Sequence, residues 1–324
     1  MTHHLDESAA QPAPRFDPVE PVRIGDPGRA AVAVKPKLDS RFPDVPAYII
    51  DADQVRDDRG GASLELRAAS IRGLSHRFYG SARQDAYARM LSEDGRYLVA
   101  CVADGVAAGE YSHLAAEIVT RDGCRNLVEQ LSAVTPEKLD WLMMLGKLVS
   151  RTVSAAHDIA RRNGGDPPGT DPREAGRYLA STALFAVIDL EPGANGEHTA
   201  HVVALGDTSA WLLNPGEAVP WTPLQHVKNS DSEVASSTTA AIPVVPAVAP
   251  ETVVVRFGPG TALVLMTDGV GDALGSGGGE VGAFLARAWA TAPTSLNFAA
   301  QVDFARRSYD DDRTALALWP VPSP

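Results

Sequence analysis

Two short apolar runs in the chain each break off at an aspartate followed by a glycine. The first is Tyr97–Val106 (YLVACVADGV), which carries Asp104, and the second is 263–269 (LVLMTDG), which carries Asp268. Apolar runs of this length are typical of buried strands, and a strand end holds its side chains rigidly at the rim of a sheet. Both runs are therefore predicted to be buried strands, and their two Asp-Gly ends suggest one shared metal site.

Further strands are predicted wherever short runs alternate in polarity or stay apolar. Residues 63–71 alternate well enough for a half-buried strand, and Tyr48-Ile49-Ile50 can add a strand at a sheet edge. The remaining predicted strands are 181–190, 198–207, the continuation TSAWLL, ETVVVRF, TALVLM and RTALALW. Most of the regular structure is therefore expected to be β.

Two helices are predicted after the first Asp-Gly pair, and two more near the end of the chain. The first carries apolar residues at helical spacing from Leu114 to Leu131, and the second follows Pro136, a residue suited to a first helical turn. The late helices are expected near Val281 and over 296–306. This order predicts the α+β class, as a four-layer αββα sandwich of two antiparallel sheets flanked by helix pairs.

Prolines recur throughout the first 46 residues and leave no apolar period intact. We therefore predict a Pro-rich, largely disordered N-terminal arm over 1–60, followed by one domain over 61–320. Residues 163–176 are expected to form a loop because of their glycines and prolines. Residues 225–250, rich in small polar residues, alanine and proline, are expected to form a long surface loop.

The charge balance excludes some partners. The chain has 324 residues, of which 44% are hydrophobic and 22% charged, with a formal net charge of -12 and a pI near 5.1. A nucleic-acid backbone is disfavoured, because binding it needs clustered Lys and Arg. Phosphorylated substrates remain compatible with this charge if divalent cations supply positive charge locally.

The sequence also favours a cytoplasmic protein. Its two cysteines, Cys101 and Cys124, both lie in predicted regular elements, which makes a disulfide framework unlikely to form and fits a reducing compartment. No stretch reaches the roughly 18 to 20 apolar residues of a membrane span. The start of the chain lacks the basic and apolar regions of a secretory signal. We expect no membrane association and a monomer.

Carboxylates collect at the ends of the predicted strands. They are Asp85, Asp104, Asp207, Asp268, Asp272 and Asp310 to Asp312. Hard divalent cations prefer oxygen ligands, and a glycine at position 105 lets its own carbonyl approach an ion. Two ions about 4 Å apart can activate a water for attack on a phosphoryl group. Any single Asp-Gly pair can be ordinary turn chemistry, so the metal interpretation depends on several pairs following buried strands.

Six motifs, in order from about Gly73 to Trp319, resemble the type 2C metal-dependent Ser/Thr protein phosphatases, especially a compact bacterial branch. The first three are GLSHRFYGSARQDAYA, like the opening Gln-Asp-Ala motif, VADGVAAGEYSHLAA, like the Asp-Gly motif before a helix, and STALFAVI, like the small-hydroxyl strand. The others are VVALGDTSAWLL, like the Gly-Asp-Ser hairpin, LVLMTDGVGDAL, like the Asp-Gly-x-x-Asp motif, and DDRTALAL, like the closing strand. The resemblance implies a central β-sandwich flanked by helices.

The resemblance also implies a set of metal ligands. Asp104 would bridge two Mn²⁺ or Mg²⁺ ions. Asp268 and Asp311 would complete the shell of one ion, while Asp85 and the Gly105 carbonyl would serve the other, partly through water.

Two further carboxylates, Asp207 and Asp272, match positions that the family uses for a weaker third ion. A family arginine near the first motif anchors the substrate phosphate; Arg77 and Arg83 both fit its spacing, and Arg77 is slightly preferred. Some members carry a histidine proton donor after the first Asp-Gly, where this chain has Val106. A metal-bound water or His76 would then protonate the leaving alkoxide, although His76 is equally suited to a structural hydrogen bond.

The last motif departs from the family pattern, because Asp312 stands where asparagine is usual. The extra charge leaves open which of Asp310, Asp311 and Asp312 is the metal ligand. Residues 225–250 occupy the place of the family's flap segment.

The resemblance implies hydrolysis of phosphoserine and phosphothreonine in proteins by a metal-activated water at a two-metal carboxylate site. The expected partners are phosphorylated protein substrates in signalling. One alternative is a catalytically weak relative that binds phosphoproteins as a regulatory scaffold. Another is a structural Ca²⁺-binding β-sandwich, which the spread of the carboxylates over many strand ends disfavours.

Overall fold

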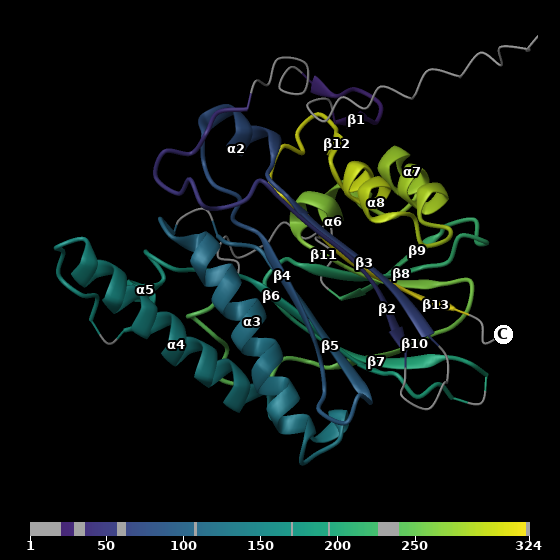
Figure 1. Ribbon diagram of the computed structural model, residues 1–324, viewed down its shortest axis with the longest axis horizontal. Coiled ribbons are helices and arrows are strands. Elements are labelled where there is room, and N and C mark those ends of the chain that lie inside the picture. Colours follow the sequence, from purple (N-terminus) through teal and green to yellow (C-terminus); the bar gives the residue numbers. More distant parts are fainter. Residues whose placement is uncertain are drawn as a thin grey trace, which may run out of the picture.

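The computed structural model centres on two antiparallel sheets (Figure 1). It describes residues 21–28, 36–56, 63–106, 109–169, 171–193, 195–225 and 240–321. The five-stranded sheet has the order β10 (Val253–Phe257), β7 (His198–Leu205), β6 (Ala183–Asp189), β5 (Tyr97–Ala103), β4 (Ala86–Leu91). The six-stranded sheet has the order β2 (Tyr48–Arg56), β3 (Ser63–Ile71), β13 (Arg313–Val321), β11 (Ala262–Met266), β8 (Ser209–Leu213), β9 (Trp221–Gln225).

The helices lie on the outer faces of the sheets (Figure 1). On the five-stranded sheet pack α3 (Ser112–Leu131) and α4 (Trp141–Arg162), and the short α5 (Pro172–Ala175) packs against α4. On the six-stranded sheet pack α6 (Asp268–Leu274), α7 (Glu280–Ala288) and α8 (Ser295–Val302). The first-motif helix α2 (Leu74–Tyr79) follows β3 directly.

Strand β5 is buried at every position because it contributes to two cores at once. Val99, Cys101 and Ala103 pack in the cluster that includes α3 and α4. The alternate residues, among them Leu98 and Val102, pack in the cluster between the two sheets. Successive side chains of a strand point to opposite faces, so a strand covered on both faces must be apolar throughout. This arrangement explains the continuous apolar runs of β5 and β11.

The helix-covered faces differ in chemistry. Against the five-stranded sheet, Gly123 of α3 lies so close to the Phe185 ring that an added Cβ would approach the ring within 2.5 Å. Against the six-stranded sheet, a chain of aromatic rings fills the core, with centroids 4.8 to 6.4 Å apart. The rings are Trp211, Trp221, Trp289, Phe298 and Trp319. Helix α3 therefore packs closely on the five-stranded sheet, whereas large aromatic rings fill the space between the six-stranded sheet and its helices.

The predicted α+β class with antiparallel sheets is confirmed. The four-layer description stays an interpretation, which the three separate core clusters support. Strand β2 extends the edge suggested by Tyr48-Ile49-Ile50, although it falls within the predicted 1–60 arm. Much of that arm, residues 1–20 and 29–35, lies outside the described residues, so its boundary stays a prediction.

Several elements differ from the sequence prediction. Residues 74–79 form α2, where only a glycine-rich passage was expected, and 86–91 form the unpredicted β4. Pro136 opens a 3-10 turn, and the helix begins at Trp141, because Asp140 accepts a hydrogen bond from the Met143 amide as its cap.

The last predicted helix, 296–306, ends at Val302 in the structure. Its final residues instead belong to β12 (Phe304–Ala305), which pairs in parallel with β1 (Val22–Arg23). The chain thus folds its early residues back against a late segment. In the described part of the chain, no helix is long and apolar enough to cross a membrane.

Trp289→Ala is expected to lower the free energy of unfolding by about 3–5 kcal/mol, because it removes a fully buried ring from the aromatic core. Urea unfolding followed by circular dichroism measures the change. Leu296→Ala on α8 is the matched control: its side chain is 67% exposed, and a change below about 0.5 kcal/mol is expected. Equal losses in the two variants would contradict the assignment of Trp289 to the core.

Candidate metal centre

Asp104 is held at the end of β5 by hydrogen bonds to its main chain. The Asp104 amide donates to Thr182 Oγ1 at 2.9 Å, and its carbonyl accepts from the Thr182 amide and from Ser181 Oγ, both at 2.9 Å. Both partners immediately precede β6, the neighbour of β5. The small hydroxyl residues of the predicted motif therefore fix the backbone of Asp104 and leave its carboxylate available.

Gly105 is required by close packing. It forms an isolated bridge with Ser181, and an added Cβ would lie 2.7 Å from the carbonyl oxygens of both Gln84 and Ser112. Real Cβ atoms do not approach backbone oxygens so closely, so a larger residue would push Asp104 out of position. The role of the Gly105 carbonyl as a metal ligand stays a prediction.

Two further carboxylates, from separate segments of the chain, lie close to that of Asp104. One carboxylate oxygen of each of Asp104, Asp207 and Asp268 lies within 4.8 Å of the others. Asp104 follows β5, Asp207 lies between β7 and β8, and Asp268 opens α6 immediately after β11. Asp272 lies one turn further along α6. Asp207, predicted to serve a third ion, therefore lies close to Asp104 and Asp268, and its role as a ligand stays a prediction.

Asp85 is buried and its position is fixed by two groups. Thr267 Oγ1 donates to Asp85 Oδ2 at 2.7 Å. The Arg83 guanidinium donates to the Asp85 carbonyl, to Ser70 Oγ at 2.8 Å and to the Pro46 carbonyl at 3.1 Å. Arg83 is thus committed to the backbone around Asp85, which favours a structural role over a phosphate-binding one.

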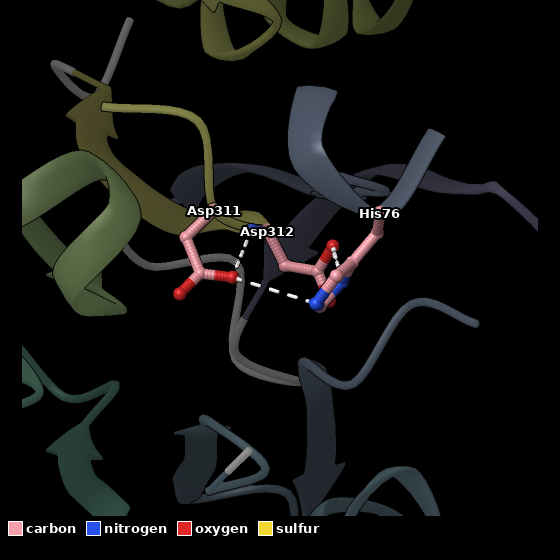
Figure 2. A group of neighbouring side chains, drawn as sticks. All are labelled: His76, Asp311 and Asp312. Carbon is pink, nitrogen blue, oxygen red and sulfur yellow. Dashed lines mark hydrogen bonds and ion pairs between the residues drawn. The ribbon is translucent and has the colours of Figure 1, made fainter. Parts of the chain in front are cut away.

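A second group lies beside the first and contains His76, Asp311 and Asp312 (Figure 2). Asp312 is 2% exposed, and its Oδ1 accepts from the Gly73 amide at 2.6 Å and lies 2.9 Å from His76 Nδ1. Its Oδ2 accepts from the Gln84 amide. Both oxygens of Asp312 are therefore occupied by protein donors, whereas the Asp311 side chain is 58% exposed and better placed to bind a ligand.

Gly73 and Gly269 allow the 310–312 loop to pack closely against the backbone on both of its sides. A Cβ at Gly73 would collide with the main chain of Asp311, and one at Gly269 would collide with the Asp312 carbonyl. The loop is consequently wedged between the starts of α2 and α6. This packing brings the last motif against the first and the fifth.

Arg77, the preferred phosphate anchor, lies in a buried ion pair. Its side chain is 3% exposed and donates to Asp303 Oδ1 at 2.7 Å and to the Arg72 carbonyl at 2.8 Å. The Arg77 guanidinium also stacks 5.4 Å from the centre of the Tyr48 ring. The predicted phosphate contact stays a prediction, and these contacts favour a structural role for Arg77.

The carboxylates of the centre resist ionisation. Burial first, and then repulsion by neighbouring carboxylates, raise the pKa of Asp85 and of Asp104 well above the usual value. Burial opposes ionisation of Asp312 too, but the His76 hydrogen bond and the Gln84 and Gly73 amides lower the pKa of Asp312. Hydrogen-bond donors of the protein therefore stabilise the ionised form of Asp312.

His76 responds to the same charges. Burial opposes its protonation, yet the hydrogen bond and charge of Asp312, followed by the charges of Asp311 and Asp85, raise the pKa of His76. Its Nε2 lies 4.0 Å from Asp311 Oδ1 (Figure 2).

The residues present fit hard divalent cations. The central donors are carboxylate oxygens from three different segments within 4.8 Å of one another. Burial, followed by the charges of neighbouring carboxylates, raises the pKa values of Asp85 and Asp104, and a bound cation would stabilise the ionised forms. Carboxylate-rich donor sets of this kind suit Mg²⁺ and Mn²⁺ better than zinc or copper.

The proposed flap is described only in part. Residues 226–239 of the 225–250 segment lie outside the described residues. Beyond them, Ile242 is fully buried and exchanges two backbone hydrogen bonds with Ser181, at 2.8 and 3.0 Å. The end of this segment is thus attached directly to the residue that holds Asp104.

Several positioning residues escaped the sequence analysis. Thr267, Thr314 and Ser70 form a buried hydroxyl network, in which Thr267 Oγ1 accepts from the Thr314 amide at 3.0 Å and Thr314 Oγ1 donates to Ser70 Oγ at 2.7 Å. In the sequence, each is a single hydroxyl residue at one end of a predicted strand. Only the pairing of β3 with β13 and of β13 with β11 brings them together.

Comparison with known proteins identifies a family. A family model described as protein phosphatase 2C matches residues 72–297, more than half of the chain. A solved bacterial serine phosphatase carrying an arginine-to-alanine mutation has 14% identity and a TM-score of 0.50, with 81% of this chain and 100% of that chain covered. At this identity the similarity shows the fold alone. No curated protein matches the sequence.

Two further solved structures are similar at lower TM-scores. The catalytic domain of the serine/threonine protein phosphatase PstP, in complex with two manganese ions, has 16% identity and a TM-score of 0.47, with 80% of this chain and 99% of that chain covered. RsbX in complex with magnesium has 13% identity and a TM-score of 0.46, with 84% of this chain and 100% of that chain covered.

In the metal-free protein, Asp104→Asn is expected to raise the Tm at pH 7. The folded-state pKa of Asp104 lies above its unfolded value, so folding favours the protonated carboxyl, and stability falls as pH rises from the unfolded toward the folded pKa. An uncharged amide avoids this cost. The expected gain is about 2–4 °C, which corresponds to about 1 kcal/mol in a domain of this size.

Calorimetry in the presence of EDTA, repeated between pH 5 and 7.5, tests this expectation. The gain should shrink toward pH 5, and Mn²⁺ should raise the Tm of the wild type more than that of the variant. Asp166→Asn, at an exposed loop position, is the control and should change neither quantity. A lower Tm for metal-free Asp104→Asn at pH 7 would contradict the repulsion described above.

Proposed function

Since the chain belongs to the protein phosphatase 2C family, we propose that it removes phosphate from phosphoserine and phosphothreonine in proteins. The observation that carries the proposal is the convergence of Asp104, Asp207 and Asp268 within the region that the family model matches. Phosphorylated proteins are the proposed partners, and a signalling role in the cytoplasm is part of the same proposal.

Two Mn²⁺ or Mg²⁺ ions are the proposed cofactors. Asp104 would contact both, with Asp268 and Asp311 on one side, and with Asp85 and the Gly105 carbonyl on the other. When bound, such ions activate water and offset charge that develops on a phosphoryl group. PstP with manganese and RsbX with magnesium are similar folds that hold the same two kinds of ion.

Asp207 and Asp272 extend the proposed ligand set. Asp207 lies within the central carboxylate group, and Asp272 follows Asp268 by one helical turn. A third, weaker ion between these positions is therefore part of the proposal.

The surrounding residues orient the ligands. Thr182 and Ser181 hold the backbone of Asp104, and Thr267 fixes one oxygen of Asp85. Asp312, whose oxygens are filled by protein donors, supports His76 and leaves Asp311 as the proposed ligand of its run. Fixing the side chains before a substrate arrives lowers the cost of reaching the reactive arrangement.

His76 is the proposed proton donor to the leaving alkoxide. Its Nδ1 is engaged with Asp312, which leaves Nε2 to carry a transferable proton. The neighbouring carboxylates raise the pKa of His76 and so favour the protonated ring near neutral pH. In this proposal His76, from the first motif, takes the role of the histidine that some family members carry at the position of Val106.

The aspartate at position 312 does not favour the scaffold alternative. The hydrogen bonds that Asp312 accepts explain how a carboxylate is tolerated there, so this departure from the family pattern is compatible with an intact site.

Purified protein is expected to hydrolyse a small aryl phosphate with Mn²⁺, and Asp104→Asn should lower kcat at least about 100-fold, because it removes the proposed shared ligand. Phosphoserine and phosphothreonine peptides should be better substrates than a matched phosphotyrosine peptide. Phosphate release with and without EDTA is the measurement, with Asp166→Asn as the control variant. Activity that survives EDTA would overturn the metal-dependent mechanism.

His76→Gln should affect substrates according to their leaving group. A serine alkoxide needs a proton to leave, so kcat for a phosphoserine peptide should fall about 100-fold. A nitrophenolate leaves without protonation, and its release should change less than about threefold. Circular dichroism would verify that the variant is folded. Equal losses on both substrates would show that His76 positions Asp312 and donates no proton.

A further inference from the structure

A pocket of about 480 Å³ lies beside the candidate metal centre. Four segments enclose it: the residues around Phe42, helix α2 with the loop after it, the start of α3, and Arg177. Its size is that of a pocket for a small ligand or a few peptide side chains.

The pocket adjoins the centre without being part of it. His76 and Gln84 line it, and both are hydrogen-bonded to Asp312. The carboxylates Asp104, Asp207 and Asp268 do not line it. A group bound here would therefore lie beside the residues that hold Asp312.

The charged side chains that line the pocket include two arginines, Arg41 and Arg177, and one glutamate, Glu110. The Arg177 side chain is exposed and makes no ion pair with any residue that the structure describes. Arg41 is paired with Glu110 at 3.4 Å, but these side chains are 62% and 53% exposed, and such surface pairs exchange partners at little cost. The chain as a whole carries a net charge of -12, so two arginines at one pocket form a local exception.

The other walls are suited to a side chain with an apolar stem. Phe42 packs on the His113 ring, with centroids 4.3 Å apart, and the exposed Tyr79 also lines the pocket. Burial lowers the pKa of His113 to about 4, so this histidine adds no charge at neutral pH. The positive groups available to an anion are therefore the two arginines, with His76 beside Asp312, and the rings offer contacts to methylene groups.

We propose that this pocket selects substrates by receiving an aspartate or glutamate side chain one to three residues from the phosphorylated residue, held between Arg41 and Arg177. The inference rests on the proposed function and adds the substrate class: acidic phosphopeptides. Planar guanidinium groups bind carboxylates through paired hydrogen bonds, which gives selectivity as well as attraction. Phe42 and Tyr79 cover the stem of the bound side chain.

The test compares two phosphoserine peptides that differ only in glutamate or glutamine next to the phosphoserine. The wild type should show a kcat/KM about fivefold higher for the glutamate peptides. Arg177→Ala should abolish that preference and leave hydrolysis of a small aryl phosphate unchanged within about twofold. Arg41→Ala should reduce the preference in the same way. Arg173→Ala is the matched control, because Arg173 lies four residues away in α5 and does not line the pocket.

Three results would overturn the inference. One is a preference for glutamate that persists in Arg177→Ala and Arg41→Ala. Another is the absence of any preference in the wild type. The third is an equal loss on both peptides and on the aryl phosphate, which would assign the arginines to the transferred phosphoryl group instead.

A binding measurement tests the pocket independently of whether the protein hydrolyses phosphate esters. Fluorescence anisotropy with the two labelled phosphopeptides and Mn²⁺ measures recognition without turnover. If the protein hydrolyses no phosphate ester, tighter binding of the glutamate peptide by the wild type, lost in Arg177→Ala, still supports the pocket. Equal binding of the two peptides by the wild type overturns it. The difference should also shrink in 0.5 M salt, because an exposed pair is screened.

Discussion

Repulsion among carboxylates is the constraint on which the rest of the structure depends. Asp85 and Asp104 lie at strand ends of the five-stranded sheet, Asp268 and Asp311 lie next to strand ends of the six-stranded sheet, and Asp207 lies between β7 and β8. Burial first, and then the charges of neighbouring carboxylates, raise the pKa values of Asp85 and Asp104. Neutral groups hold this arrangement from behind: threonine and serine hydroxyls, main-chain amides, and glycines that admit the backbone of a neighbouring segment. The folding energy comes from cores elsewhere, where apolar side chains cover both faces of β5 and β11. The apolar cores therefore supply the stability that keeps the carboxylates together.

Asp312 shows how hydrogen bonds stabilise one buried carboxylate among several neighbouring ones. Its two oxygens accept from the Gly73 amide at the start of α2 and from the Gln84 amide before β4, and Oδ1 also lies at hydrogen-bond distance from His76 Nδ1. An asparagine at this position would offer only one oxygen to three donors. The aspartate therefore matches its surroundings better than the family's usual residue would, and the donors Gly73 and Gln84 are tied to the loop that carries Asp311.

The sequence predicts the strands and the carboxylates well, for a physical reason. Strands buried on both faces must be continuously apolar, so β5 and β11 stand out, and an aspartate after such a run is easy to recognise. The roles of Arg77 and Arg83 could not be predicted in the same way. Both lie near Asp85 in the sequence, but Arg77 turns to Asp303 and Arg83 to Pro46 and Ser70, partners up to 226 positions away. Arg41 falls within the predicted N-terminal arm, and nothing in the local sequence marks it as part of a pocket.

Strand β13 is the last strand of the described chain, yet it lies in the middle of its sheet, between β3 and β11. The residues just before it carry Asp311 and Asp312 and pack against Gly73 and Gly269. During synthesis the six-stranded sheet must therefore stay open until the ribosome has released residues 313–321. A chain interrupted earlier lacks both the central strand and two of the clustered carboxylates. Assembly of the metal centre is in this way coupled to completion of the domain, and a partly made chain cannot hold it.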